Sequence, residues 1–197
     1  THGVLSEEVT MKKACVLFAD GFEEVEAITP VDYLRRARID VVTLGLEGQE
    51  IRGAHGITIR TDAELKARGG GSSSLSAFDC VVVPGGMPGA KNIAASHDAT
   101  RIIGDVFNGG GLVAAICAAP VVVLSPLGFL KGRRFTCFQG MEKDAAGGIF
   151  SEERVVRDGN LITSRAAGCA AEFSVAVIRY LLGDGAAEAV QNSTLSR

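Results

Sequence analysis

One cysteine stands where a short apolar run meets small residues, and this placement suits nucleophilic chemistry. Cys117 directly follows the apolar run 112–116 and precedes Ala118 and Ala119. A strand that turns sharply into a helix can hold one side chain strained and exposed, as at a nucleophile elbow. Because a helix N-terminus favours an anion, a thiol there is expected to be more acidic than usual. We therefore predict that Cys117 is reactive.

A packing role for the same residue is the alternative, since free cysteine is among the most buried residue types. The five cysteines are odd in number and form no Cys-x-x-Cys pair, so neither a disulfide framework nor a zinc site is predicted. The three histidines have no metal-ligand spacing, and we expect no metal. Cysteines inside apolar runs are typical of a reducing compartment, so we expect a cytoplasmic protein.

The composition indicates one ordinary globular domain. A chain of 197 residues that is 47% hydrophobic can bury a substantial core, and its net charge is only −3. Basic residues are scattered, so no nucleic-acid partner is expected. No apolar run approaches the roughly 20 residues of a membrane span, and the first ten residues lack the apolar core of a signal peptide. We interpret residues 1–11 as an N-terminal extension or an expression remnant, and residues 12–197 as the domain.

The elements that must position the cysteine alternate between strands and helices. Short apolar runs at 14–18, 40–46, 79–84 and 112–116 predict buried parallel strands. Helices are predicted at 22–37, which contains Pro30 and should be kinked there, at 93–95, 99–107, 118–124 and 168–182. This alternation predicts a three-layer α/β/α sandwich with right-handed crossovers. Sites in such sheets form beyond the carboxyl ends of the strands, where the Gly85-Gly86 turn and Cys117 both lie.

Smaller elements complete this prediction. Short strands are expected at 50–52, 57–59 and 134–137, and a hairpin should join 154–157 to 161–164. Residues 63–68 are predicted to form one or two helical turns, residues 69–74 a surface loop, and residues 186–191 a final helix.

Five motifs occur in order along residues 12–192. They are Gly-Phe-Glu-Glu-Val-Glu at 21–26, Pro-Val-Asp-Tyr-Leu-Arg-Arg at 30–36, Val-Pro-Gly-Gly at 83–86, Ala-Ala-Ile-Cys-Ala-Ala-Pro at 114–120 and Thr-Ser-Arg at 163–165. With them the chain resembles the ThiJ/PfpI superfamily, in particular its branch of Parkinson-linked protein deglycases (DJ-one-like proteins). The resemblance implies a flavodoxin-like, mostly parallel sheet with a nucleophile elbow, and a homodimer.

The resemblance also implies the site residues. Cys117 matches the family's reactive cysteine and Glu26 its partner carboxylate, while Gly86, beside Gly85, and Ala118 match the backbone N–H groups of an oxyanion pocket. A carboxyl group close to a thiolate forms a coupled pair, and a protonated Glu26 would favour the thiolate by donating a hydrogen bond. The helical pattern alone places Glu23 and Glu24 nearer the apolar face. For each of Glu23, Glu24 and Glu26, the alternative role is that of an acid that stabilises the first helical turn.

The chain departs from the family at two places near this site. Many relatives carry a histidine where Phe138 stands, and Phe138 cannot transfer a proton. His55 matches a position where relatives often have arginine near the site and the dimer contact; it is either an auxiliary acid–base group or a solvated turn histidine. Arg165 is a further auxiliary candidate. After it, the family's Gly-Pro-Gly is replaced by residues 166–168, Ala-Ala-Gly, which should reshape the pocket wall.

The leading functional interpretation, implied by the resemblance, is a cofactor-independent enzyme of the glyoxalase III or deglycase type. It would act on methylglyoxal and related reactive dicarbonyls and contribute to carbonyl and oxidative stress defence. The alternative is a redox-sensing, chaperone-like protective protein whose Cys117 is oxidised to a sulfinate. A cysteine peptidase or amidotransferase is a weaker interpretation, because it requires a histidine near Cys117.

Overall fold

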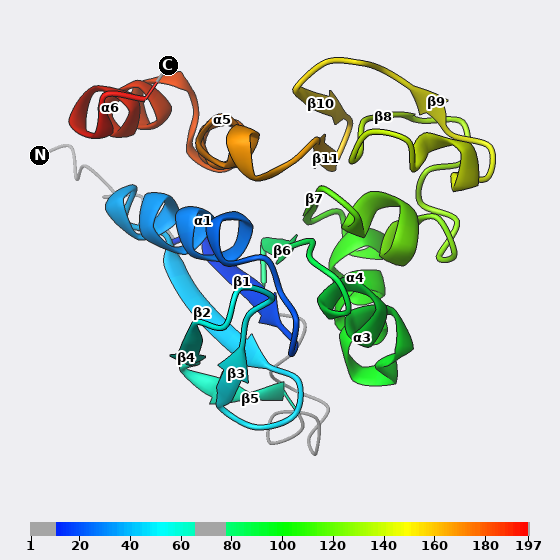
Figure 1. Ribbon diagram of the computed structural model, residues 1–197. Helices are drawn as coiled ribbons and strands as arrows, with labels where there is room; N and C mark the ends of the chain where they lie inside the picture. Colours follow the sequence, from blue (N-terminus) through cyan, green and yellow to red (C-terminus); the bar gives the residue numbers. More distant parts are fainter. Residues whose placement is uncertain (1–10, 66–77, 197) are drawn as a thin grey trace, which may run out of the picture.

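The computed structural model describes residues 11–65 and 78–196 and contains a central seven-stranded sheet (Figure 1). The strand order is β10-β11-β7-β6-β1-β2-β5, and every neighbouring pair is parallel except the antiparallel pair β10–β11. The strands are β1 (Lys13–Phe18), β2 (Asp40–Gly45), β5 (Ala63–Glu64), β6 (Cys80–Val83), β7 (Leu112–Ile116), β10 (Val155–Asp158) and β11 (Leu161–Ser164).

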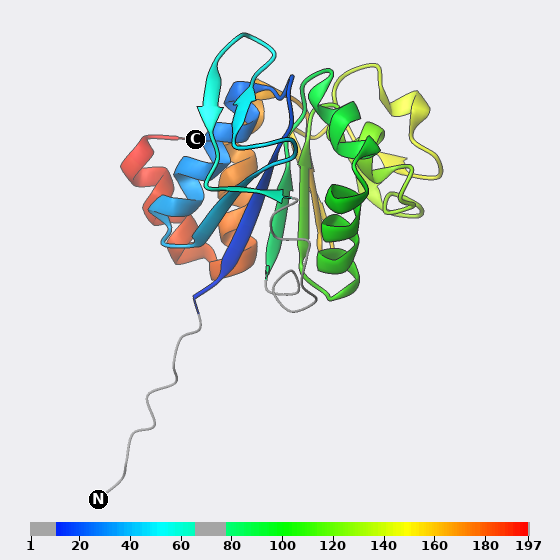
Figure 2. The same ribbon diagram turned by 90° about the horizontal axis from the view of Figure 1, so that it is seen from below.

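Helices cover both faces of the sheet, which confirms the predicted α/β/α sandwich (Figures 1 and 2). One face carries α1 (Glu24–Arg36), which spans Pro30, together with α5 (Ala170–Leu182) and α6 (Asp184–Thr194). The other face carries α3 (Gly89–Ala95) and α4 (His97–Asn108).

Two buried clusters form the core, one on each face of the sheet. In β1, Cys15 and Leu17 belong to one cluster, while Val16 and Phe18 belong to the other. Successive side chains of a strand point to opposite faces, so a strand buried on both sides must be apolar throughout. This requirement explains why the short apolar runs predicted the strands correctly.

Short elements account for the differences from prediction. Ala63 and Glu64 form edge strand β5 against β2, so this part of the predicted helical segment 63–68 is wrong. Leu65 is helical as predicted, and residues 66–68 and the predicted loop 69–74 lie outside the described residues. The predicted strand 134–137 is only β8 (Arg134–Phe135), paired in parallel with the unpredicted β9 (Ile149–Phe150). Two-residue strands are too short to show periodicity.

The remaining elements are hairpins and short helical segments. The two expected short strands are β3 (Glu50–Arg52) and β4 (Thr58–Arg60), which pair as an antiparallel hairpin, and the predicted hairpin β10–β11 is confirmed. Residues Pro120–Leu124 form a single π-helical segment, η2, instead of a regular helix, and two 3₁₀ turns are η3 (Glu142–Asp144) and η4 (Ala167–Cys169). Within the described ranges, no helix combines the length and apolar character needed to cross a membrane.

Candidate active site

Cys117 lies at a strained elbow at the carboxyl end of β7. Its backbone has a φ of +65°, a region that non-glycine residues adopt rarely and at an energetic cost. Hydrogen bonds hold it from both sides: the Cys117 N–H donates to the carbonyl of Ser164 over 2.9 Å, and the Phe138 N–H donates to the carbonyl of Cys117 over 2.8 Å. Neighbouring β11 and the segment after β8 therefore fix the elbow that the sequence predicted.

The turn after β6 brings a glycine between the carboxylate and the cysteine. Gly85 N–H donates to Glu26 Oε2 over 3.0 Å, and Glu23 N–H donates to the Gly85 carbonyl over 3.0 Å. A Cβ atom at position 85 would lie 2.6 Å from Glu26 Oε2 and 2.7 Å from Cys117 Cβ. Only glycine permits this approach, so Gly85 is required for the Glu26–Cys117 contact.

Glu26 is the acid that the fold places against the thiol. Its side chain lies on the first turn of α1, is only 1% exposed and hydrogen-bonds Cys117, while Glu23 caps the helix by accepting from the Glu26 N–H over 2.7 Å. Burial raises the pKa of Glu26 to about 7, and the nearby Glu23 charge acts in the same direction. The hydrogen bonds from Cys117, Gly85 and the Ala167 backbone act against this shift.

The thiol itself is less acidic than the helix-terminus argument predicts. Burial first, and then the charge and hydrogen bond of Glu26, raise the pKa of Cys117 to about 12. Hydrogen bonds from the backbone N–H groups of Ala118 and Gly86 lower it, but do not offset burial. Between these two pKa values the buried pair holds one proton, which serves both the carboxyl oxygen and the sulfur.

The N–H groups of Gly86 and Ala118 therefore both hydrogen-bond the sulfur. Gly86 reaches this position with a φ of +88°, and a Cβ atom there would lie 2.4 Å from the Glu23 nitrogen. Donors fixed in this way can stabilise negative charge on sulfur, or on an oxygen bonded to a carbon that the sulfur has attacked.

A cavity of about 480 Å³ opens over Cys117. Its lining joins the elbow and the Gly86 turn to Met87, Phe138 and the turn 139–141. Phe138 thus lies in the cavity wall, and no histidine is among the described residues that line the cavity.

His55 contacts Glu24 and not Glu26. Its Nδ1 lies 2.7 Å from Glu24 Oε2 and 3.9 Å from Glu23 Oε1, and its side chain is 70% exposed. The hydrogen bond to Glu24 raises the pKa of His55. Burial acts to raise the pKa of Glu24, but the hydrogen bonds from the His55 side chain and from the backbone of Glu24, His55 and Ile57 together outweigh it, and the net shift is downward. His55 is absent from the lining of the Cys117 cavity.

These three side chains, Glu23, Glu24 and His55, place potential ligand atoms within 4.8 Å of one another. Glu24 already accepts hydrogen bonds from the backbone of His55 and Ile57 as well as from the imidazole. Their mutual contacts account for the cluster without a metal.

Arg165 and Ala167 make different kinds of contact. Arg165 donates to the Glu152 carbonyl over 3.1 Å, and its guanidinium lies 6.0 Å from the Phe150 ring, so its polar contacts support the segment beside β9. Ala167 was not predicted as a site residue, yet its N–H hydrogen-bonds Glu26. The sequence could have indicated this contact, because Ala167 has a backbone N–H and the proline of the family's Gly-Pro-Gly motif at this position has none.

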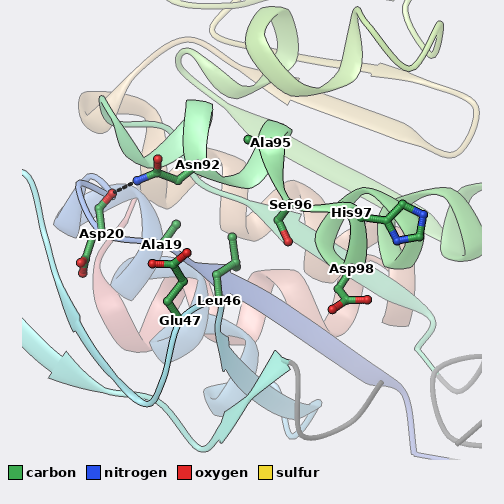
Figure 3. A pocket seen from close by; sticks show the side chains of 9 residues that line it. All are labelled: Ala19, Asp20, Leu46, Glu47, Asn92, Ala95, Ser96, His97 and Asp98. Atoms are coloured by element: carbon green, nitrogen blue, oxygen red, sulfur yellow. Dashed lines mark hydrogen bonds between the residues drawn. The ribbon is translucent and has the colours of Figure 1, made fainter. Parts of the chain in front are cut away.

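A second cavity lies beyond β1 and β2 (Figure 3). It measures about 450 Å³, and its polar lining includes Asp20, Glu47, Asn92 and Asp98. The Asn92 side chain donates to the Asp20 carbonyl over 2.9 Å. None of the described residues that line it is a cysteine.

The fold and the elbow define a class: α/β sandwich proteins with an elbow cysteine that hydrogen-bonds a buried glutamate. The chain belongs to the DJ-1/PfpI family, whose sequence profile matches residues 12–180. It is 36% identical over 176 residues to the Parkinson disease protein 7 homolog of Danio rerio, covering 87% of this chain and 90% of that protein. It is 32% identical over 158 residues to a deglycase of Pyrococcus abyssi, covering 79% and 91%.

A solved structure agrees with the architecture. A cysteine-to-alanine mutant of a DJ-1 superfamily protein from Salmonella typhimurium superposes with a TM-score of 0.88 at 36% identity, covering 95% of this chain and all of that one. This agreement confirms both the family and the fold that the sequence motifs predicted.

Proposed function

We propose that the chain is a cofactor-independent enzyme that converts methylglyoxal and related reactive dicarbonyls to 2-hydroxy acids in the cytoplasm. One observation carries this proposal: Cys117 and Glu26 form a buried hydrogen-bonded pair beside the N–H groups of Gly86 and Ala118. The deglycase name of the Pyrococcus abyssi relative adds support.

The pair supplies every proton that the reaction needs. The Cys117 thiolate adds to the aldehyde carbon and forms a hemithioacetal, whose oxygen accepts hydrogen bonds from Gly86 and Ala118. Glu26 gives the proton of the pair to that oxygen and, now a carboxylate, removes the proton from the carbon and returns it to the adjacent carbonyl carbon, while the hydroxyl proton passes to the oxygen of that second carbon. The first carbon is oxidised to a thioester while the second is reduced to an alcohol, and water hydrolyses the thioester to lactate and free thiol.

The test follows lactate formation from methylglyoxal by the wild type, Cys117→Ala and Glu26→Gln. We expect lactate from the wild type only. Lactate that survives Cys117→Ala would refute the mechanism. Equal activity in the wild type and Glu26→Gln would remove the proton shuttle but leave the nucleophile.

A redox-sensing, protective role is the second candidate, and the same hydrogen bond favours it. A carboxyl group held against the sulfur can stabilise a Cys117 sulfinate formed by peroxide. Mass spectrometry after mild peroxide treatment should show two oxygens gained selectively at Cys117. Without lactate formation, this result would favour sensing over catalysis.

We also propose a homodimer. Exposed apolar side chains at Val25 and Ile28 on α1, and at Ile57 in the hairpin tied to α1 by the His55–Glu24 contact, offer a surface that a second copy would cover. Size-exclusion chromatography with light scattering should give twice the chain mass; a monomer would contradict this proposal.

A further inference from the structure

The wall of the Cys117 cavity is apolar. Phe138 and Met87 line it and remain 46% and 45% exposed, and Met141 completes the same side. Among the described residues of the lining, only Gln139 contributes a polar amide side chain, and none carries a formal charge at neutral pH when Cys117 is a thiol. Apolar side chains left open around a nucleophile form a surface that a ligand can cover.

This wall is held in place by the elbow itself. The Phe138 N–H donates to the Cys117 carbonyl over 2.8 Å, and the Met141 N–H donates to the Phe138 carbonyl over 3.1 Å. The backbone of the 138–141 turn is therefore fixed relative to the sulfur, and the cavity is formed before any substrate arrives.

The N–H groups of the elbow orient a bound aldehyde. Its carbon must reach Cys117 Sγ, and its oxygen must face the N–H groups of Gly86 and Ala118. The rest of the substrate then extends into the cavity of about 480 Å³, toward Phe138 and the two methionines. A methyl group would leave most of this space to water, whereas an aromatic ring would contact both the Phe138 ring and methionine sulfur.

We propose, building on the proposed function, that this site prefers 2-oxoaldehydes bearing an aromatic or branched apolar substituent over methylglyoxal, with Phe138 as the specificity-determining residue. A substituent carrying a carboxylate is disfavoured, because the lining that the structure describes holds no cation to pair with it.

The first experiment compares kcat/KM for phenylglyoxal and for methylglyoxal in the wild type, Phe138→Ala and Phe138→Leu. The intrinsic reactivities of the two aldehydes cancel when the phenyl-to-methyl ratio of a variant is divided by that of the wild type. We expect Phe138→Ala to lower this ratio about tenfold, in the range that apolar pocket contacts discriminate, and Phe138→Leu to lower it less. An unchanged ratio in Phe138→Ala would overturn the proposal.

Ile149→Ala is the matched control. Ile149 is an apolar side chain that is 56% exposed on β9 and is absent from the cavity lining. The phenyl-to-methyl ratio of kcat/KM in Ile149→Ala should equal that of the wild type. An equal fall of this ratio in Ile149→Ala and Phe138→Ala would show a general surface effect and overturn the assignment to Phe138.

A second measurement separates this inference from the proposed function, because it needs no turnover. Alkylation rates at Cys117 are followed by mass spectrometry with iodoacetamide and with its N-benzyl derivative, using Cys117→Ala as the blank. A benzyl preference that Phe138→Ala abolishes supports the apolar site even if no 2-hydroxy acid forms, in which case only the proposed function fails. Lactate formation with no benzyl preference and no phenylglyoxal preference overturns the inference and leaves the function standing.

Discussion

The carboxyl group of Glu26, on the first turn of α1, hydrogen-bonds the thiol of Cys117 at the end of β7. The two residues come from distant parts of the sequence and meet because β1, which precedes α1, and β7 are parallel strands that end at the same edge of the sheet. Gly85 N–H, 3.0 Å from Glu26 Oε2, holds the carboxyl in place. This contact makes several properties of the protein depend on one shared proton.

The first prediction concerns stability against pH. Because burial raises the pKa of Glu26 from 4.5 to about 7, the folded state binds more protons than the unfolded state between these values. The free energy of unfolding should therefore fall as pH rises through this window. Glu26→Gln keeps an acceptor for Gly85 N–H and removes the titration, so at pH 8 it should be more stable than the wild type by roughly 3 kcal/mol, at about 1.4 kcal/mol per pKa unit.

Urea unfolding at pH 5 and at pH 8 measures this difference. Parallel pH dependence in the wild type and Glu26→Gln would contradict the assignment of a raised pKa to Glu26.

A second prediction concerns Ala167. Its backbone N–H lowers the pKa of Glu26 by hydrogen-bonding the carboxylate, and proline at this first position of η4 would remove the donor. In Ala167→Pro the pKa of Glu26 should rise, and the midpoint of the pH profile for Cys117 alkylation should move to higher pH. Ala167→Gly keeps the N–H and should leave the midpoint in place. Equal midpoints in all three proteins would show that this donor has no influence.

A third prediction concerns Gly85. An added methyl would lie 2.6 Å from Glu26 Oε2 and 2.7 Å from Cys117 Cβ, with the Ile116 carbonyl oxygen 3.0 Å away. Gly85→Ala should cost about 1–3 kcal/mol of stability, as for other overpacked sites, and slow Cys117 alkylation. Gly104→Ala is the control, because Gly104 lies within α4 and a Cβ atom there would meet no atom within 4 Å. Thermal unfolding should show that this variant has a free energy of unfolding roughly 0.5–1 kcal/mol higher than the wild type. Similar losses in both variants would contradict the steric explanation.

A fourth prediction concerns His55. Its contact with Glu24 raises its pKa above 6.5, while the pKa of Glu24 is lowered. The contribution of this pair to stability is therefore present at about pH 6, where His55 is protonated and Glu24 is ionised, and is lost as pH rises through the raised pKa of His55. NMR titration should show this pKa fall toward the ordinary value in Glu24→Gln, and fall less in Glu23→Gln, since Glu23 Oε1 is 3.9 Å away.

The same residue decides whether a histidine takes part in the Cys117 chemistry. His55 is held by Glu24 and does not line the Cys117 cavity. His55→Ala should therefore keep the pH profile of Cys117 alkylation unchanged. A shifted profile would instead show that His55 is an auxiliary acid–base group.

Strand prediction succeeded where burial alone decides the residue type. Strands β1, β6 and β7 are buried on both faces, so their apolar runs identify them without knowledge of their neighbours. Prediction failed at β5 and β9 and gave β8 twice its length; these three strands are two residues long and exist only because a partner strand lies beside them. The regular helix expected at 118–124 is a short π-helical segment, a distinction that apolar periodicity cannot make.

The sequence by itself determined the elbow at Cys117, the glycines that follow β6 and, through its motifs, the family. Tertiary structure alone decided the chemistry of the pair. The acids at 23, 24 and 26 are close in sequence, and the packing of α1 against the sheet decides which contact each one makes. Glu26 hydrogen-bonds the thiol, Glu24 binds His55, and Glu23 caps the helix. It also raised, rather than lowered, the pKa of Cys117, because desolvation and a neighbouring carboxylate depend on what the fold brings close, not on position along the chain.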